Sequence, residues 1–221
     1  MTSLRRHLIT LPPAIALARF AGVELPAAHA QPALPPEGQG WRRVSPPVRS
    51  EVPPGKIEVV EFFWYGCPHC HRFEPVLRRW IAQLPEDVVF RRVHVPFQER
   101  KHQQLYYTLL AMGEEEKLGL AVFRALHEER RRLDSDKEII DWAQAQGLDR
   151  KAFSDHFTSF GVRTAMTRGT REMTEYGVDG VPMIGVAGKY LTAPSMAGSN
   201  QAALDLVDKM IAHERVAARK S

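Results

Sequence analysis

A nine-residue run of mainly β-branched and aromatic residues, from Ile57 to Tyr65, constrains the fold of this 221-residue chain more than any other feature. Apolar residues occupy both faces of the run, which is typical of a central strand buried on both sides. The run ends at Gly66, and from Pro68 apolar residues recur every three or four positions, as in an amphipathic helix. A second strand is predicted over residues 88–95. The folded part of the chain therefore contains a strand, a tight turn, a helix and a strand in succession.

The rest of the pattern predicts a block of helices and then two more strands. Residues 97–161 have helical periodicity throughout, with Ser135 as one N-cap, and a further helix is predicted over residues 162–175. Two short strands, over about residues 181–186 and 189–192, precede a last amphipathic helix capped by Ser199 or Asn200. This order indicates an α/β domain made of residues 56–97 and 163–221, with an inserted all-helical domain over residues 98–162.

The first 30 residues have the features of an export signal. Two arginines, Arg5 and Arg6, precede a moderately apolar stretch, and Ala28 and Ala30 supply the small residues of a cleavage site near Ala30. Prolines and one arginine interrupt the apolar stretch, so a disordered cytoplasmic leader remains an alternative. No other stretch reaches the length of a membrane span. We therefore expect an exported, soluble protein.

Residues 31–55 contain seven prolines and are expected to be extended, with a short edge strand near residues 41–44. The net charge is +4, of which the signal carries +2 (three arginines against one glutamate), so the exported part carries +2. A charge this small does not indicate a protein that binds nucleic acid.

The only two cysteines, Cys67 and Cys70, lie three residues apart where the strand passes into the helix. A disulfide across so short a loop removes little chain entropy, so the pair is better explained by chemistry than by stability. At a helix N-terminus the unpaired N–H groups and the helix dipole favour a thiolate, and Pro68 suits the first helical turn. We therefore predict that Cys67 is an exposed nucleophile with a lowered pKa, assisted by His69, and that Cys70 is the buried resolving thiol.

Two alternatives use the same cysteines. Residues 67–71 also spell C-x-x-C-H, the attachment motif of c-type haem, which would make the chain an electron carrier. A zinc site would need further ligands, and His94 and His102 do not have the spacing of a compact zinc motif. We expect no metal and no cofactor, and we expect surface or capping roles for His94, His102, His127, His156 and His213.

Two further positions stand out. Glu61 interrupts the buried strand six residues before Cys67, either as an acid that reaches solvent or as a buried acid that exchanges a proton with Cys70. Pro182 follows Val181 at the start of a predicted strand, and on the sequence alone this X–Pro bond is expected to be trans.

Several motifs, taken in order, resemble the DsbA-type periplasmic disulfide oxidases of the thioredoxin superfamily. They are Glu61-Phe62-Phe63, Cys67-Pro68-His69-Cys70, Gly180-Val181-Pro182 and Gly188-Lys189-Tyr190. The resemblance implies a thioredoxin fold with an inserted helical domain. It also implies a mixed disulfide at Cys67, a buried acid at Glu61, and a cis Val181–Pro182 bond that binds the substrate backbone.

The resemblance further implies the partners of such an enzyme. These are reduced secreted client proteins and a quinone-linked membrane reoxidase of the DsbB type. A disulfide isomerase or reductase on the same fold is the alternative activity. Isomerases of this kind usually add a dimerisation domain, for which residues 31–55 are too short, so we expect a monomeric oxidase.

Overall fold

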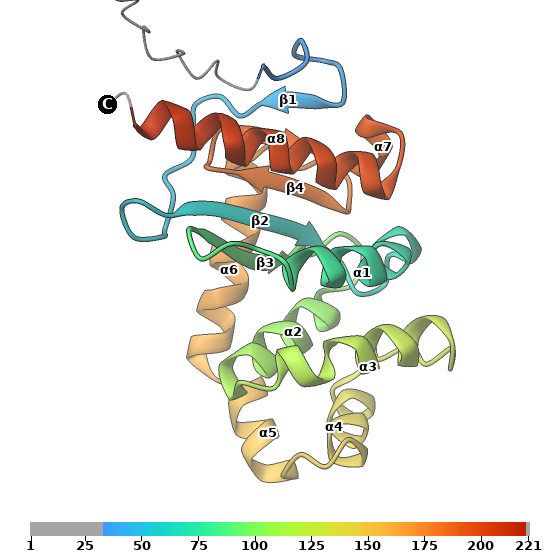
Figure 1. Cartoon of the computed structure of the whole chain (residues 1–221). Helices are drawn as coiled ribbons and strands as arrows, with labels where there is room; N and C mark the ends of the chain where they lie inside the picture. Colours follow the sequence, from blue (N-terminus) through green and yellow to red (C-terminus); the bar gives the residue numbers. More distant parts are fainter. Residues whose placement is uncertain (1–32, 220–221) are drawn as a thin grey trace, which may run out of the picture. The chain divides into compact units, whose positions relative to one another are not determined.

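The computed structural model describes residues 33–219, and the predicted export signal, residues 1–30, lies outside them. A five-stranded sheet has the order β1-β5-β4-β2-β3, in which β2 and β3 are parallel and the other neighbours are antiparallel (Figure 1). The strands are β1 (Trp41–Arg43), β2 (Ile57–Phe63), β3 (Val88–His94), β4 (Met183–Val186) and β5 (Tyr190–Thr192). The strand expected near residues 41–44 is thus present and lies at one edge of the sheet.

Helices cover both faces of the sheet. On one face α1 (Pro68–Ile81) and α8 (Asn200–Ala218) pack through Phe73, Leu77 and Leu204 against Val59 and Ile184. On the other face Val60 and Phe62 pack with Tyr176, which follows α6 (Phe160–Glu175). Figure 1 shows α8 and α1 in front of the sheet and α6 behind it. The alternation of Val59 and Val60 between the two faces follows the two-residue period of a strand.

Four helices form the predicted insertion between β3 and α6. They are α2 (Arg100–Met112), α3 (Glu115–His127), α4 (Asp136–Ala145) and α5 (Arg150–Phe157), and the short α7 (Pro194–Ala197) lies outside the insertion. The core of the insertion includes Phe123 and Trp142 and is continuous with Phe63 and Tyr65 beside the cysteines. The α/β fold of the thioredoxin type with a helical insertion is therefore confirmed. We propose 98–162 as the extent of the insertion, although residue 162 already lies in the first turn of α6.

Local signals fixed several helix ends. The Ser135 hydroxyl accepts a hydrogen bond from the Glu138 N–H at 3.3 Å, and Ser199, rather than Asn200, caps α8 by accepting from Ala202 at 3.0 Å. β2 ends at Phe63, two residues earlier than predicted, because Trp64 and Tyr65 belong to the turn that leads to Cys67. β4 begins at Met183 because Pro182 has no N–H to donate to a neighbouring strand.

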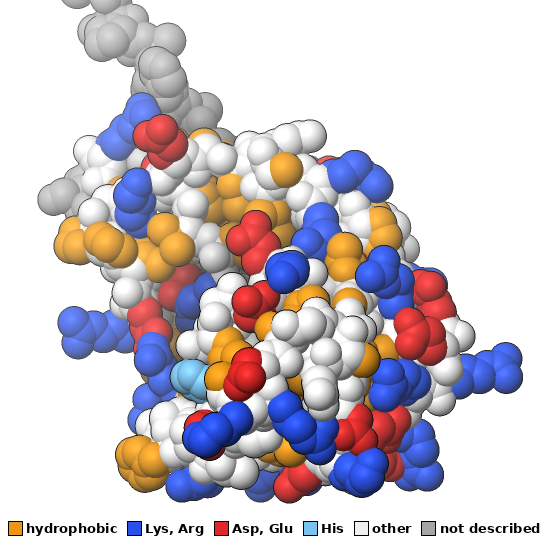
Figure 2. All heavy atoms as spheres, turned by 90° about the horizontal axis from the view of Figure 1, so that it is seen from below, with side chains coloured by type: hydrophobic (Ala, Val, Ile, Leu, Met, Phe, Trp, Pro, Cys, Tyr) orange, Lys and Arg blue, Asp and Glu red, His pale blue; other side chains and the backbone are white. Residues whose placement is uncertain are grey.

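Charged side chains on the surface are largely paired. On the side of α4 and α5, drawn in Figure 2, basic and acidic side chains lie next to one another. Examples are Lys137 and Arg150, each 2.6 Å from Asp141, and Lys151, 2.7 Å from Asp155. Such exposed pairs contribute roughly 0–1 kcal/mol each, so the stability of the insertion comes mainly from its apolar core.

Candidate active site

Cys67 is the N-cap residue of α1, and its backbone is extended (φ −84°, ψ 117°) immediately before Pro68. Both cysteines are free, and the exposed fraction of the residue is 6 % for Cys67 and 1 % for Cys70. The prediction that Cys67 is exposed is therefore wrong, since only a small part of the residue is open to solvent. The order of accessibility is nevertheless the predicted one.

The two thiols differ strongly in acidity. The pKa of Cys67 is lowered to about 6, first because the Cys70 thiol donates a hydrogen bond to it, and then because the N–H groups of Cys70 and His69 do so. The charge of His69 contributes less. The pKa of Cys70 is raised far above its ordinary value by burial first, and then by its hydrogen bond to Cys67 and the negative charges of Cys67 and Glu61. Within one helical turn, Cys67 is therefore the thiol that ionises easily and acts as the nucleophile, whereas Cys70 resists ionisation.

Glu61 is buried, with 1 % of the residue exposed, so the interpretation that it reaches solvent is wrong. Its carboxylate lies 3.0 Å from the guanidinium of Arg92, which is opposite it in the β2–β3 register. The pKa of Glu61 is raised to about 8, mainly by burial and then by the nearby carboxylates of Glu74 and Glu115, against the opposing effect of Arg92.

Arg92 contacts three carboxylates at once, two of them buried and that of Glu115 partly buried. Besides Glu61, it lies 2.8 Å from Glu74 of α1 and 3.6 Å from Glu115 of α3. Glu74 also pairs with Arg78 at 3.0 Å. The oxygen that each carboxylate turns toward Arg92 is buried and lies at ion-pair distance, but it makes no hydrogen bond of regular geometry. Three carboxylates against two guanidinium groups leave a surplus of negative charge, which favours retention of a proton in this cluster.

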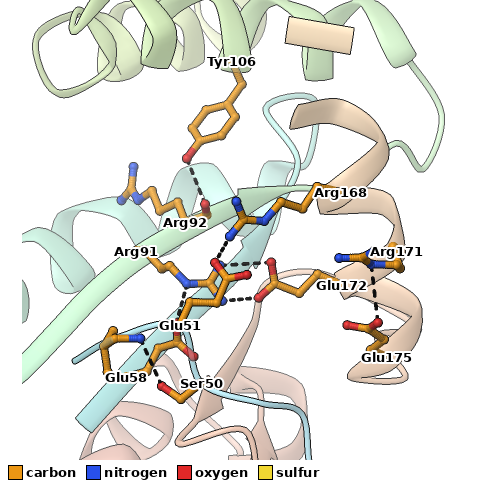
Figure 3. A network of polar contacts seen from close by, with 11 residues as sticks. Ser50, Glu51, Glu58, Arg91, Arg92, Tyr106, Arg168, Arg171, Glu172 and Glu175 are labelled. Atoms are coloured by element: carbon orange, nitrogen blue, oxygen red, sulfur yellow. Dashed lines mark hydrogen bonds and ion pairs between the residues drawn. The ribbon is translucent and has the colours of Figure 1, made fainter. Parts of the chain in front are cut away.

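The neighbouring arginine on β3 points to the opposite face of the sheet. Arg91 pairs with Glu58 at 2.7 Å and with both carboxylate oxygens of Glu172 of α6 (Figure 3). Figure 3 also shows the Tyr106 hydroxyl, which donates to the backbone carbonyl of Arg92 at 3.0 Å. Alternation along β3 therefore sends Arg91 to a structural ion pair and Arg92 to the acids beneath the cysteines.

Three residues of this cluster were not predicted from the sequence: Arg92, Glu74 and Glu115. A signal existed for two of them. Arg92 is a charged residue within the strand predicted over residues 88–95, and Glu74 lies four residues after Cys70 and so on the same helix face. Nothing local identifies Glu115, which reaches Arg92 from the first turn of α3.

The Val181–Pro182 bond is cis, as the resemblance implied and the base rate of X–Pro bonds did not. The carbonyl oxygen of Val181 lies 3.5 Å from the sulfur of Cys67, although the two residues are 114 positions apart. A groove of about 550 Å³ runs beside this contact, lined in part by His69, Val181, Pro182, Met183 and Met196. The structure thus brings Cys67, His69, Val181 and Pro182 together at one opening.

His69 is exposed, and its Nδ1 lies 2.9 Å from the Arg72 guanidinium. Since guanidinium can only donate, His69 accepts on Nδ1 and carries any proton of its neutral form on Nε2. As an exposed residue of the groove lining, His69 lies beside the groove rather than under the cysteines.

Surface or capping roles are wrong for His94 and His102, whose exposed fractions are 0 % and 5 %. His94 and His127 bind the backbone of Tyr65, and His102 binds the indole of Trp64. Within residues 33–219, no group of three or more His, Cys, Asp and Glu side chains is arranged to hold a metal ion.

Comparison with known proteins agrees with this geometry. Residues 58–209 match the family described as the DSBA-like thioredoxin domain. The chain belongs to this family. A thiol:disulfide interchange protein DsbA of Bordetella parapertussis is 41 % identical over 206 residues, which cover 91 % of this chain and 95 % of the relative. One from Burkholderia cepacia is 35 % identical over 192 residues, covering 86 % and 91 %.

A solved DsbA structure gives the same result. The crystal structure of Pseudomonas aeruginosa DsbA superposes with a TM-score of 0.79 at 39 % identity, covering 83 % of this chain and 96 % of that one. As a member of the DsbA-like family, the chain is a thiol:disulfide oxidoreductase, an enzyme whose chemistry takes place between sulfur atoms.

Proposed function

We propose that this protein is a periplasmic disulfide oxidase that donates a disulfide between Cys67 and Cys70 to reduced, exported client proteins. The observation that carries the proposal is the opposed acidity of the two thiols, with the pKa of Cys67 near 6 and that of Cys70 far above its ordinary value. A reduced form stabilised as the Cys67 thiolate makes the corresponding disulfide a stronger oxidant.

Donation would proceed in two exchange steps. A client thiolate attacks the Cys67 sulfur, forming a client–Cys67 disulfide, and the Cys67–Cys70 bond breaks with its electron pair on Cys70. A second client thiolate then attacks the client sulfur of the mixed disulfide and releases Cys67 as a thiolate. The client is oxidised by two electrons and the enzyme is reduced by two. Release of Cys67 is favoured because a thiol of lower pKa is the better leaving group.

Cys70 needs a proton in the first step because its buried thiolate is unstable. We assign the donor role to Glu61, which is near enough to raise the pKa of Cys70 when it is ionised. Its own pKa of about 8 leaves it mostly protonated at neutral pH. During reoxidation the proton would return from Cys70 to Glu61. Since Arg92 contacts Glu61, Glu74 and Glu115, the proton can be shared within the cluster.

The client chain would bind beside the Val181–Pro182 bond. The groove there contains apolar side chains, and the Val181 carbonyl faces the reacting sulfur at 3.5 Å. We propose that Val181 and Pro182 bind the client backbone and that His69, at the rim, stabilises the Cys67 thiolate through its backbone N–H. With exposed fractions of 6 % and 1 %, the two sulfurs have little room for a porphyrin, which favours the disulfide proposal over haem attachment.

Reoxidation requires an electron acceptor, for which we propose a quinone-linked membrane partner of the DsbB type. Periplasmic location is proposed from the family and from the export signal predicted at residues 1–30. No helix in the part of the chain that the structure describes is long and apolar enough to cross a membrane.

The redox equilibrium of Cys67 and Cys70 against a glutathione buffer tests the proposal, with alkylation and mass measurement as the readout. Disulfide isomerases have reduction potentials near about −180 mV, and we expect this protein to have a less negative one. A potential near about −270 mV, typical of thioredoxin, would instead assign the protein to the reductases.

A further inference from the structure

The peptide group of Tyr65, two residues before Cys67, is fixed on both sides by histidines. The Tyr65 N–H donates to Nε2 of His94 at 3.1 Å, and the Tyr65 carbonyl accepts from Nε2 of His127 at 2.8 Å. Because a carbonyl can only accept, His127 must carry a proton on Nε2. Because an N–H can only donate, Nε2 of His94 must carry none. The two rings therefore hold opposite tautomers.

His127 belongs to the helical insertion and contacts the chain on both sides of the cysteine motif. It is the last residue of α3, and its ring stacks on that of His71, the residue after Cys70, with centroids 4.9 Å apart and planes 8° apart. Phe123, one turn earlier in α3, stacks on both rings at 5.7 and 6.0 Å. A single side chain thus connects the insertion to the segment before Cys67 and to the helix after Cys70.

The residues on either side of Tyr65 are also held in place by close contacts. The Trp64 indole donates to Nδ1 of His102 at 3.2 Å, and Nε2 of His102 lies 2.9 Å from the Arg132 carbonyl. A Cβ added to Gly66 would lie 2.3 Å from the Trp64 ring, so the turn is closely packed there. His127 binds the Tyr65 carbonyl within this closely packed turn, two residues before Cys67.

We propose that His127 is a positioning residue for the exchange reaction: its bond to the Tyr65 carbonyl holds the Cys67 sulfur against the first-turn N–H groups of α1. The proposal rests on the redox role of Cys67 proposed above, but not on whether the protein oxidises or reduces its clients. It assigns to the helical insertion a direct part in the reactivity of the cysteine.

The surroundings of His127 favour a neutral ring. Burial lowers its pKa first, and the charges of His71, His102 and Arg72 lower it further, whereas the bond to Tyr65 raises it. The carboxylate of Glu128 lies 3.5 Å from Nε2 of His71, on the other ring of the stack. Since the Nε2–H group is present in both the neutral and the charged ring, the bond to Tyr65 does not depend on protonation. A side chain with an N–H donor and no titration should therefore replace it.

The test compares His127→Leu, which removes the donor, with His127→Gln, which retains one, and with His156→Gln on the exposed surface of α5 as control. The Cys67 titration is read from thiolate absorbance and from the rate of alkylation against pH. We expect His127→Leu to raise the Cys67 pKa by about one unit, a roughly tenfold loss of thiolate below the pKa. His127→Gln and His156→Gln should titrate as the wild type does.

A folded His127→Leu protein with the wild-type Cys67 titration would overturn the proposal, and so would a His127→Gln protein that behaves like the leucine variant. If His127→Leu does not fold, nitrogen NMR of the wild-type imidazoles decides instead. The proposal requires a proton on Nε2 of His127, and a ring protonated only on Nδ1 contradicts it. A reducing potential would end the oxidase proposal while leaving this one intact.

Discussion

The difference in stability between the reduced and oxidised proteins should depend on pH through Cys67. Folding lowers the pKa of this thiol from 9.0 to about 6. The unfolded chain therefore binds a proton that the folded chain has lost, over the window between these values. The sign is that of an acid with a depressed pKa. The stabilisation is complete above pH 9, decreases as the pH falls and vanishes below about pH 6.

The magnitude follows from the width of that window. At pH 7 the folded thiolate contributes about 1.4 kcal/mol to the stability of the reduced protein, at pH 8 about 2.7 kcal/mol, and at pH 5 less than about 0.1 kcal/mol. The disulfide closes a loop of only four residues, which stabilises the oxidised protein by about 2 kcal/mol at every pH. The oxidised form should therefore be the more stable at pH 5, the two should be close at pH 7, and the reduced form should be ahead at pH 8.

Urea unfolding of both redox forms at pH 5, 7 and 8 measures this difference directly. Between pH 5 and 7 the stability difference should shift by about 1.4 kcal/mol in favour of the reduced form. This shift corresponds to about 3–6 °C in Tm and to about 30 mV in the reduction potential of the Cys67–Cys70 disulfide. The Cys67→Ala variant, which forms no disulfide, is the control for the reduced protein, because it retains Glu61 and the histidines but has no thiolate at this position. The assignment of the thiolate to Cys67 is refuted if the difference between the redox forms does not move with pH. It is also refuted if the stability of Cys67→Ala changes with pH as much as that of the reduced wild type.

Three further outcomes are expected. Iodoacetamide should alkylate Cys67 much faster than Cys70 at pH 6–7, as followed by peptide mass, since only the first pKa is lowered; equal rates would contradict this. Glu61→Gln should fold but slow the exchange steps in which Cys70 gains or loses a proton, measured by stopped-flow across pH 5–9; an unchanged pH profile would leave Glu61 a purely structural acid. Pro182→Thr should prolong mixed disulfides at Cys67, visible on non-reducing gels; Pro194→Ala, which changes another proline of the groove lining, is the matched control and should not accumulate them.

Part of this site was predictable because its signals are local. The Cys67–Cys70 pair, the strand before it and Pro68 at the first helical position are adjacent in the sequence, and their consequences follow from the geometry of a helix N-terminus. The helical insertion was predictable for the same reason, since apolar periodicity and caps such as Ser135 indicate its helices locally.

The partners of Glu61 were not predictable, because they depend on strand order and register. Arg92 meets Glu61 only because β2 and β3 are parallel neighbours with those residues opposite each other. Glu115 joins them only because α3 returns to the edge of the sheet. An isolated glutamate in an apolar run indicates that its carboxylate either has an ion-pair partner or retains a proton. The sequence alone does not distinguish these two possibilities.

The acidity of Cys67 and Cys70 illustrates the same limit at close range. The two thiols are three residues apart in one short motif, yet folding shifts their pKa values in opposite directions. The first sulfur lies at the open end of α1, where N–H groups face it, and the second lies within the helix, where burial and the charge of Glu61 oppose ionisation. The motif supplies the sulfur atoms and the helix start. The sheet supplies Glu61, and the helical insertion supplies His127, which binds the turn at Tyr65. The difference in acidity between the two cysteines therefore depends on the whole fold.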